Sequence, residues 1–70
     1  MRHYKGRSTP SGSLLVIQTP RGFAAALADA IDAAGLPEVA GTVAGDNTVF
    51  VACADGHTPL EVDAELRSRP

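Results

Sequence analysis

Cysteine, histidine and long apolar runs are scarce in this sequence of 70 residues, and each scarcity excludes a class of protein. Cys53 is the only cysteine, so the chain cannot form a disulfide within itself. The two histidines, His3 and His57, lie far apart and form no cluster that would suit a structural metal. No apolar run reaches the roughly 18 residues of a membrane span. The stretch 14–17 is also too short for a signal-peptide core, so we expect a cytoplasmic protein.

Aromatic residues are equally scarce, with two Phe, one Tyr and no Trp, although 44% of the residues are hydrophobic. Much of the apolar content therefore comes from alanine and other small side chains. A chain of this length forms one small domain, whose limited core is marginally stable without further support. Because disulfides and a metal are excluded, we expect oligomerisation to supply that support.

Basic residues are outnumbered, with 6 Lys and Arg against 8 Asp and Glu and a net charge of −2. This balance argues against nucleic-acid binding by the chain. The N-terminus is an exception, because residues 2–7 combine four basic or histidine side chains with Tyr4. That cluster is a basic arm, the remnant of a linker to a DNA-binding module, or a solvated tail. Residues 8–13 have loop composition, so we expect a flexible basic segment over 1–13 and a folded domain over 14–70.

Residues 14–18 form a continuous apolar run of strand length, which suits a central strand covered on both faces. No alternation is visible before this run, so a preceding strand is expected to be missing, irregular or shortened. Thr19 fits a helix N-cap and Pro20 the first helical position, which predicts a helix over 20–34 that ends at Gly35. Its predicted core-facing stripe consists of Phe23, Leu27, Ala30, Ile31 and Ala34.

Residues 39–43 and 48–53 are rich in β-branched side chains and predict two further strands. Thr58 and Glu61 flank Pro59 in the pattern of a capping box, which predicts a short helix to about Arg67. The sequence contains no internal repeat. This order of elements predicts an α+β fold, a small two-layer sandwich with the helices on one face of an antiparallel sheet.

The turn between the last two predicted strands carries an isolated carboxylate. Asp46 is the only formal charge between Glu38 and Asp55, and its neighbours Gly45 and Asn47 both suit a tight turn. Two interpretations are open at this point. The carboxylate is either ordinary turn chemistry or a group held on a rigid support to bind a cation.

A second acidic feature lies on the predicted helix, where Ala25, Asp29 and Asp32 are spaced i, i+4 and i+7 and share a face. Like charges at this spacing repel each other, and the face carries no Lys or Arg. Asp32, and less so Asp29, is therefore either part of a solvated polar face or a group that a bound cation would stabilise.

Residues with catalytic potential are not arranged for catalysis. No nucleophile and base occur at a spacing that supports a reaction. Cys53 lies within a predicted strand and suits a small buried side chain. His57 follows Asp55 in a predicted turn. We therefore expect neither an enzyme nor a cofactor.

Residues 41–48, Gly-Thr-Val-Ala-Gly-Asp-Asn-Thr, resemble the ligand-binding motif of the arginine repressor C-terminal domain, which is usually Gly-Thr-Ile/Val-Ala-Gly-Asp-Asp-Thr. Residues 19–25, Thr-Pro-Arg-Gly-Phe-Ala-Ala, resemble the helix start of that family, Thr-x-Pro-Gly-Ala-Ala. Residues 31–32 and 36–39 resemble the end of the same helix and the beginning of the next strand. The resemblance covers residues 14–51 and continues weakly to residue 66. The family has a strand before residue 14 and a longer last helix, so the chain departs from it at both ends.

The resemblance implies a domain that binds L-arginine as an effector and assembles as a trimer, with two trimers stacked into a hexamer around the ligand. DNA would be contacted only through a separate N-terminal domain that this chain lacks. The ligand-binding positions that the resemblance implies are Asp46, Asn47, Ala44 and Thr48 in the turn motif and Asp32 and Ala25 on the predicted helix.

Two of these positions depart from the family. Asn47 stands where the family usually has a second Asp, which predicts weaker arginine binding or a ligand with less positive charge. Ala25 stands where the family often has Gln or His, so that contact is lost or made through water.

Two functions follow from the resemblance and its departures. The first is an L-arginine-sensing and oligomerisation domain of a transcriptional regulator of arginine metabolism. The alternative is an assembly module that binds no ligand and co-oligomerises with a full-length repressor, and the residues at positions 25 and 47 favour it.

Overall fold

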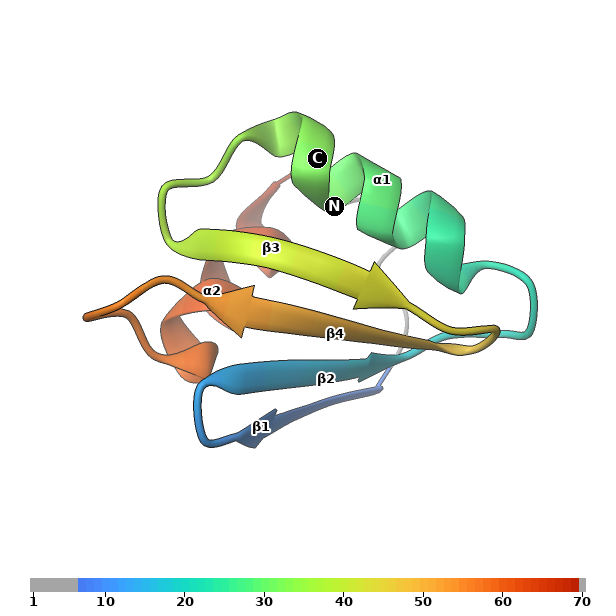
Figure 1. The fold of residues 1–70 in the computed structure, drawn as a ribbon, viewed down its shortest axis with the longest axis horizontal. Helices are drawn as coiled ribbons and strands as arrows, with labels where there is room; N and C mark the ends of the chain where they lie inside the picture. The colour runs from blue at the N-terminus through green and yellow to red at the C-terminus, as the bar shows by residue number, and fades with distance from the viewer. Residues whose placement is uncertain (1–6, 70) are drawn as a thin grey trace.

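The computed structural model describes residues 7–69 as a four-stranded antiparallel sheet with two helices (Figure 1). The sheet order is β1-β2-β4-β3, and α1 packs on β3 and β4 while α2 packs on β2 and β1. This is the two-layer α+β sandwich expected from the sequence. The bounds of the elements are β1 Arg7–Ser11, β2 Leu14–Gln18, α1 Ala24–Ala34, β3 Val39–Ala44, β4 Thr48–Cys53 and α2 Pro59–Ser68.

The first strand corrects an expectation from the sequence. Residues 8–13 have loop composition, yet β1 pairs antiparallel with β2 from Arg7 opposite Gln18 to Ser11 opposite Leu14. The strand forms because the apolar β2 beside it provides a pairing partner, which local composition does not reveal. Residues 1–6, including the rest of the basic cluster, lie outside the described part of the chain.

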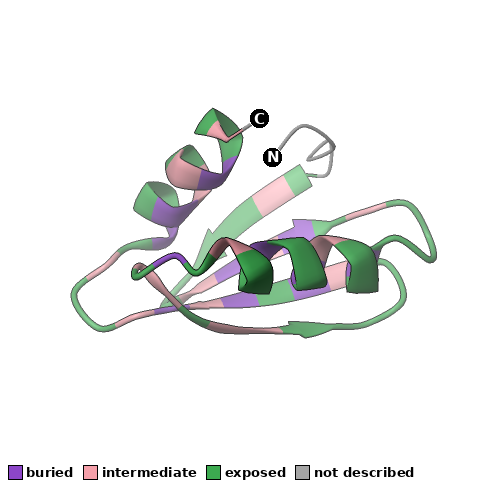
Figure 2. Cartoon of the chain, turned by 90° about the horizontal axis from the view of Figure 1, so that it is seen from above, coloured by how far each residue is buried: buried purple, intermediate pink, exposed green. Residues whose placement is uncertain are grey.

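The two faces of the sheet differ in what covers them. The inner face, which packs against the helices, carries Leu15, Ile17, Val49 and Val51, all 0% exposed. The outer face carries Leu14, Val16, Val43, Phe50 and Ala52, and Val43 and Phe50 are 72% and 46% exposed. The run 14–18 therefore forms an interior strand as expected, but within this chain the helices cover only one of its faces. Figure 2 shows buried segments on the helices and inner strands, whereas the residues of β3 are intermediate or exposed.

Both edges of the sheet are irregular. In β1, Pro10 has no backbone N–H, so it removes one donor from that edge. In β3, the pairing with β4 shifts register between Val39 and Gly41, which is a β-bulge. The β1 edge thus lacks one donor although its pairing with β2 is regular, and the β3 edge carries a bulge.

The start of α1 also differs from the expectation. The helix begins at Ala24 rather than Pro20, and Phe23 occupies the N-cap position with its side chain 62% exposed. Gly22, three residues after the predicted N-cap Thr19, adopts φ +84°, a left-handed conformation that does not fit a helix. The helix end is as predicted, because Gly35 is left-handed and its N–H donates to the Asp32 carbonyl at 3.2 Å.

The packing stripe of α1 changes with that start. Ala24, Ala28 and Ile31 are buried, and Leu27 and Ala34 pack partly against the core. Phe23 and Ala30, two members of the predicted stripe, are exposed instead. Two alanines and Ile31 thus form the buried face of this helix.

The second helix confirms the predicted capping box. The Thr58 side chain accepts from the Glu61 N–H at 3.1 Å, and the Glu61 carboxylate accepts from the Thr58 N–H at 3.3 Å. Its buried residues are Pro59, Val62 and Leu66. Asp63 and Arg67 of α2 both bond the Ser8 hydroxyl, at 3.1 and 3.0 Å, which ties α2 to β1.

Candidate functional site

The turn between β3 and β4 is bound to the connection between β2 and α1, which lies at the same end of the sheet (Figure 1). The Thr19 N–H donates to the Asn47 carbonyl at 2.7 Å. The Gly22 N–H donates to the Asp46 carbonyl at 3.0 Å and to the Asp46 Oδ1 at 3.1 Å. These bonds hold the two loops together as one unit, so the carboxylate is supported from both sides.

Asp46 is partnered on both carboxylate oxygens. Its Oδ1 accepts from Gly22, and its Oδ2 accepts from the Arg21 Nε at 3.1 Å. The two side chains of this ion pair are 88% and 59% exposed, for Arg21 and Asp46 respectively. The sequence interpretation missed Arg21 as a partner. A signal was available, because Arg21 is the only Lys or Arg between Arg7 and Arg67.

The remaining turn residues complete the hairpin. The Gly45 N–H donates to the Thr48 carbonyl at 2.7 Å and closes the turn. The Thr48 hydroxyl donates to the Asn47 Oδ1 at 3.0 Å. Ala44 is the exposed last residue of β3. The structure therefore gathers four of the six predicted ligand positions, Ala44, Asp46, Asn47 and Thr48, at one end of the sheet.

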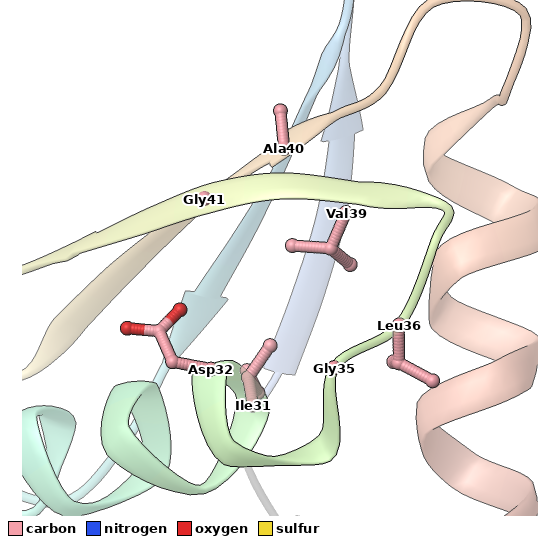
Figure 3. A pocket seen from close by; sticks show the side chains of 7 residues that line it. All are labelled: Ile31, Asp32, Gly35, Leu36, Val39, Ala40 and Gly41. Carbon is pink, nitrogen blue, oxygen red and sulfur yellow. The ribbon is translucent and has the colours of Figure 1, made fainter.

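Asp32 occupies a different position, near the end of α1. Its Oδ1 accepts from the Thr42 hydroxyl at 3.0 Å. It also lines a pocket of about 130 Å³ between α1 and β3, whose other lining residues include the apolar Ile31, Leu36 and Val39 (Figure 3). Thr42 lies within β3, whereas Asp46 lies in the turn beyond Ala44, the last residue of that strand. Within one chain, Asp32 and Asp46 therefore mark two distinct positions.

Ala25, the sixth predicted position, is exposed on α1, as is the neighbouring Asp29. The methyl group of Ala25 itself provides no polar contact for a ligand. The helix face that was singled out in the sequence is thus available to solvent, and its polar character comes from the two aspartates.

The groups considered for catalysis have structural roles. Burial, and next the negative charge of Glu61, raise the pKa of the Cys53 thiol, which disfavours the reactive thiolate. The His57 Nδ1 lies 2.8 Å from the Glu61 Oε2 at the start of α2. Among residues 7–69, no three His, Cys, Asp or Glu side chains are grouped to hold a metal ion. The same residues include no helix that is long and apolar enough to cross a membrane.

Comparison with known proteins identifies this arrangement. The family model described as arginine repressor, C-terminal domain, matches residues 7–68. The chain belongs to this arginine repressor family. The match begins with β1, which places that strand inside the family domain. The family is one of transcriptional regulators of arginine biosynthesis and not of enzymes, and its C-terminal domain is the arginine-binding and oligomerisation domain.

One relative is the arginine repressor of Anaeromyxobacter sp. (strain Fw109-5). It is 61% identical over 59 residues, which are 84% of this chain and 32% of the relative. The chain therefore spans about a third of the length of that repressor.

Proposed function

We propose that this chain is an L-arginine-sensing and oligomerisation domain of a transcriptional regulator in the cytoplasm. The observation that carries the proposal is Asp46, a carboxylate that two loops hold rigidly and that already binds a guanidinium group, that of Arg21. Carboxylates bind guanidinium groups with charge-assisted hydrogen bonds, and a preorganised carboxylate loses little entropy on binding. DNA would be contacted through a domain outside this chain.

The assembly that we propose is a trimer that stacks with a second trimer. The outer face of the sheet, with Val16, Val43 and Phe50, supplies apolar surface for contacts within the trimer. The end of the sheet that carries Asp46 would then face the second trimer. Arginine bound between the trimers would favour the hexamer, because a ligand that binds only the assembled form stabilises it by mass action.

The experiment that tests arginine binding is calorimetric titration of L-arginine into the parent protein and an Asp46→Asn variant. Asparagine keeps the side-chain shape and can still accept from the Gly22 N–H, so the hairpin is expected to persist. The change removes the charge that faces the ligand. Loss of one partner from a charge pair that is buried by assembly costs on the order of 2–5 kcal/mol. We therefore expect arginine affinity to fall by at least about tenfold to a hundredfold.

The matched control is Asp29→Asn, which removes the same charge from an exposed position on α1. It is expected to change arginine affinity much less. If the Asp46 variant bound arginine as tightly as the parent, the turn carboxylate would have only a structural role and the proposal would be wrong.

A second candidate function is an assembly module that needs no ligand and co-oligomerises with a full-length repressor. The observation that favours it is that Arg21 already neutralises Asp46, while Asn47 adds no second charge. Sedimentation with and without L-arginine separates the two functions. An arginine-sensing domain increases in mass or stability of assembly with the ligand, whereas the assembly module does not respond.

A further inference from the structure

We infer that Arg21 is an internal competitor of the effector, a tethered guanidinium that a bound guanidinium ligand must displace from Asp46. The inference rests on the proposed function and adds to it a residue that sets the ligand concentration at which the domain responds. It follows from the contact between Arg21 and Asp46 and from the chemical identity of the two competing groups.

The competing group has the same chemistry as the side chain of the effector. The Arg21 Nε donates to the Asp46 Oδ2 at 3.1 Å, while the Oδ1 on the other side accepts from the Gly22 N–H. An arginine ligand offers the same N–H donors to the same oxygen. The Oδ2 could accept a second hydrogen bond, but a second guanidinium there would lie against the like charge of Arg21 and share its single carboxylate. Ligand binding therefore includes the cost of breaking the internal pair.

The ion pair between Arg21 and Asp46 is weak enough for a ligand to displace it. Its two side chains are 88% and 59% exposed, and exposed ion pairs contribute little to stability. The backbone bond from Gly22 to the Asp46 carbonyl does not depend on Arg21, so the turn keeps its shape when the side chain moves away. Arg21 thus attenuates binding without blocking it.

The charge balance of the turn also supports competition by Arg21. Asp46 is the only formal charge between Glu38 and Asp55, and Asn47 is neutral. With Arg21 paired to it, the turn has no net charge to attract a cationic ligand. Removal of Arg21 exposes one full negative charge and strengthens attraction to a cation.

The test is calorimetric titration of L-arginine into the parent, Arg21→Gln and Arg69→Gln. Arg69→Gln is the matched control, because it removes the same charge from a residue that pairs with Glu65 on α2 and not with Asp46. We expect Arg21→Gln to bind L-arginine about two- to fivefold more tightly, the range that an exposed ion pair allows. The control is expected to bind as the parent does. A third variant, Arg21→Lys, keeps the charge and is expected to bind less tightly than Arg21→Gln.

The outcomes separate this inference from the function on which it rests. If the parent binds L-arginine and Arg21→Gln binds it equally or more weakly, the internal competitor is refuted while arginine sensing stands. If neither protein binds L-arginine, arginine sensing itself fails and the competitor falls with it. In an Asp46→Asn background, Arg21→Gln is expected to have no effect on affinity. A gain there equal to that in the parent would show that Arg21 acts through some group other than Asp46, which also overturns the inference.

Discussion

The two faces of the sheet carry similar apolar side chains in opposite surroundings. On β2, Leu15 and Ile17 point to the inner face and are 0% exposed, while their neighbour Val16 points outward and is half-buried. On β4, Phe50 lies beside Val16 on the outer face and is 46% exposed. The apolar content of the chain thus exceeds what its two helices can cover. Burial of the inner face therefore stabilises the fold of one chain, and we expect the outer face to form contacts between chains.

The strongest test of this comparison is a matched pair of substitutions on one strand. Ile17→Ala leaves a cavity in the covered face and is expected to lower the free energy of unfolding by about 2–5 kcal/mol. Val16→Ala, one residue away on the outer face, is expected to lower it by less than about 1 kcal/mol in the separated subunit. Chemical denaturation of both variants at low protein concentration measures the difference. Equal losses would show that the two faces are equivalent in the folding of one chain.

The next test addresses the outer face directly. Phe50→Ser removes the largest apolar side chain of that face and is expected to weaken self-association at least about tenfold, because aromatic side chains contribute strongly at interfaces. Analytical ultracentrifugation over a dilution series measures the effect. Leu60→Ser is the control, since Leu60 is 67% exposed but lies on α2, away from the outer face. If both substitutions weakened self-association to the same degree, the outer face of the sheet would not be the specific interface.

The smallest expected effect concerns how α2 is held over the inner face. The hydrogen bond from His57, followed by that from the Thr58 N–H, lowers the pKa of Glu61 below its ordinary value of 4.5. The folded state therefore favours the carboxylate. Its stabilising contribution is present above about pH 4.5 and is lost as the pH falls through the lowered folded pKa.

A Glu61→Gln variant tests this acid dependence. At neutral pH it is expected to be slightly less stable than the parent, and the difference should shrink as the pH falls below 4.5. Thermal unfolding of both proteins across this range measures it. Parallel stability curves over the whole range would mean that the cap of α2 does not titrate with folding.

The parts of the fold that could be predicted from sequence are those encoded by neighbouring residues. The strand at 14–18 follows from an apolar run, and the start of α2 from the spacing of Thr58 and Glu61. The first strand was missed because its conformation depends on pairing with β2 rather than on its own pattern. The start of α1 was misplaced because Gly22 bonds to Asp46, a residue 24 positions away.

In the candidate site, too, the sequence predicts what neighbouring residues encode and not what depends on distant contacts. The local motif around the turn points to Asp46, and the structure places that carboxylate in a rigid turn. Its partner Arg21 lies 25 residues earlier in the chain, and only the folded sheet brings the two together. Sequence spacing on α1 placed Asp32 on an exposed face, but its bond to Thr42 depends on how the helix packs against β3.

The irregular edges of the sheet bear on how copies of this chain can grow into larger structures. An exposed regular edge strand is a template on which further strands add without limit, which leads to fibres. Pro10 removes a donor from one edge, and the bulge between Val39 and Gly41 bends the other. Open-ended growth of a continuous sheet is thereby disfavoured at both ends. A chain with an uncovered apolar face can then satisfy it only through contacts that close on themselves, so association is expected to stop at a finite particle.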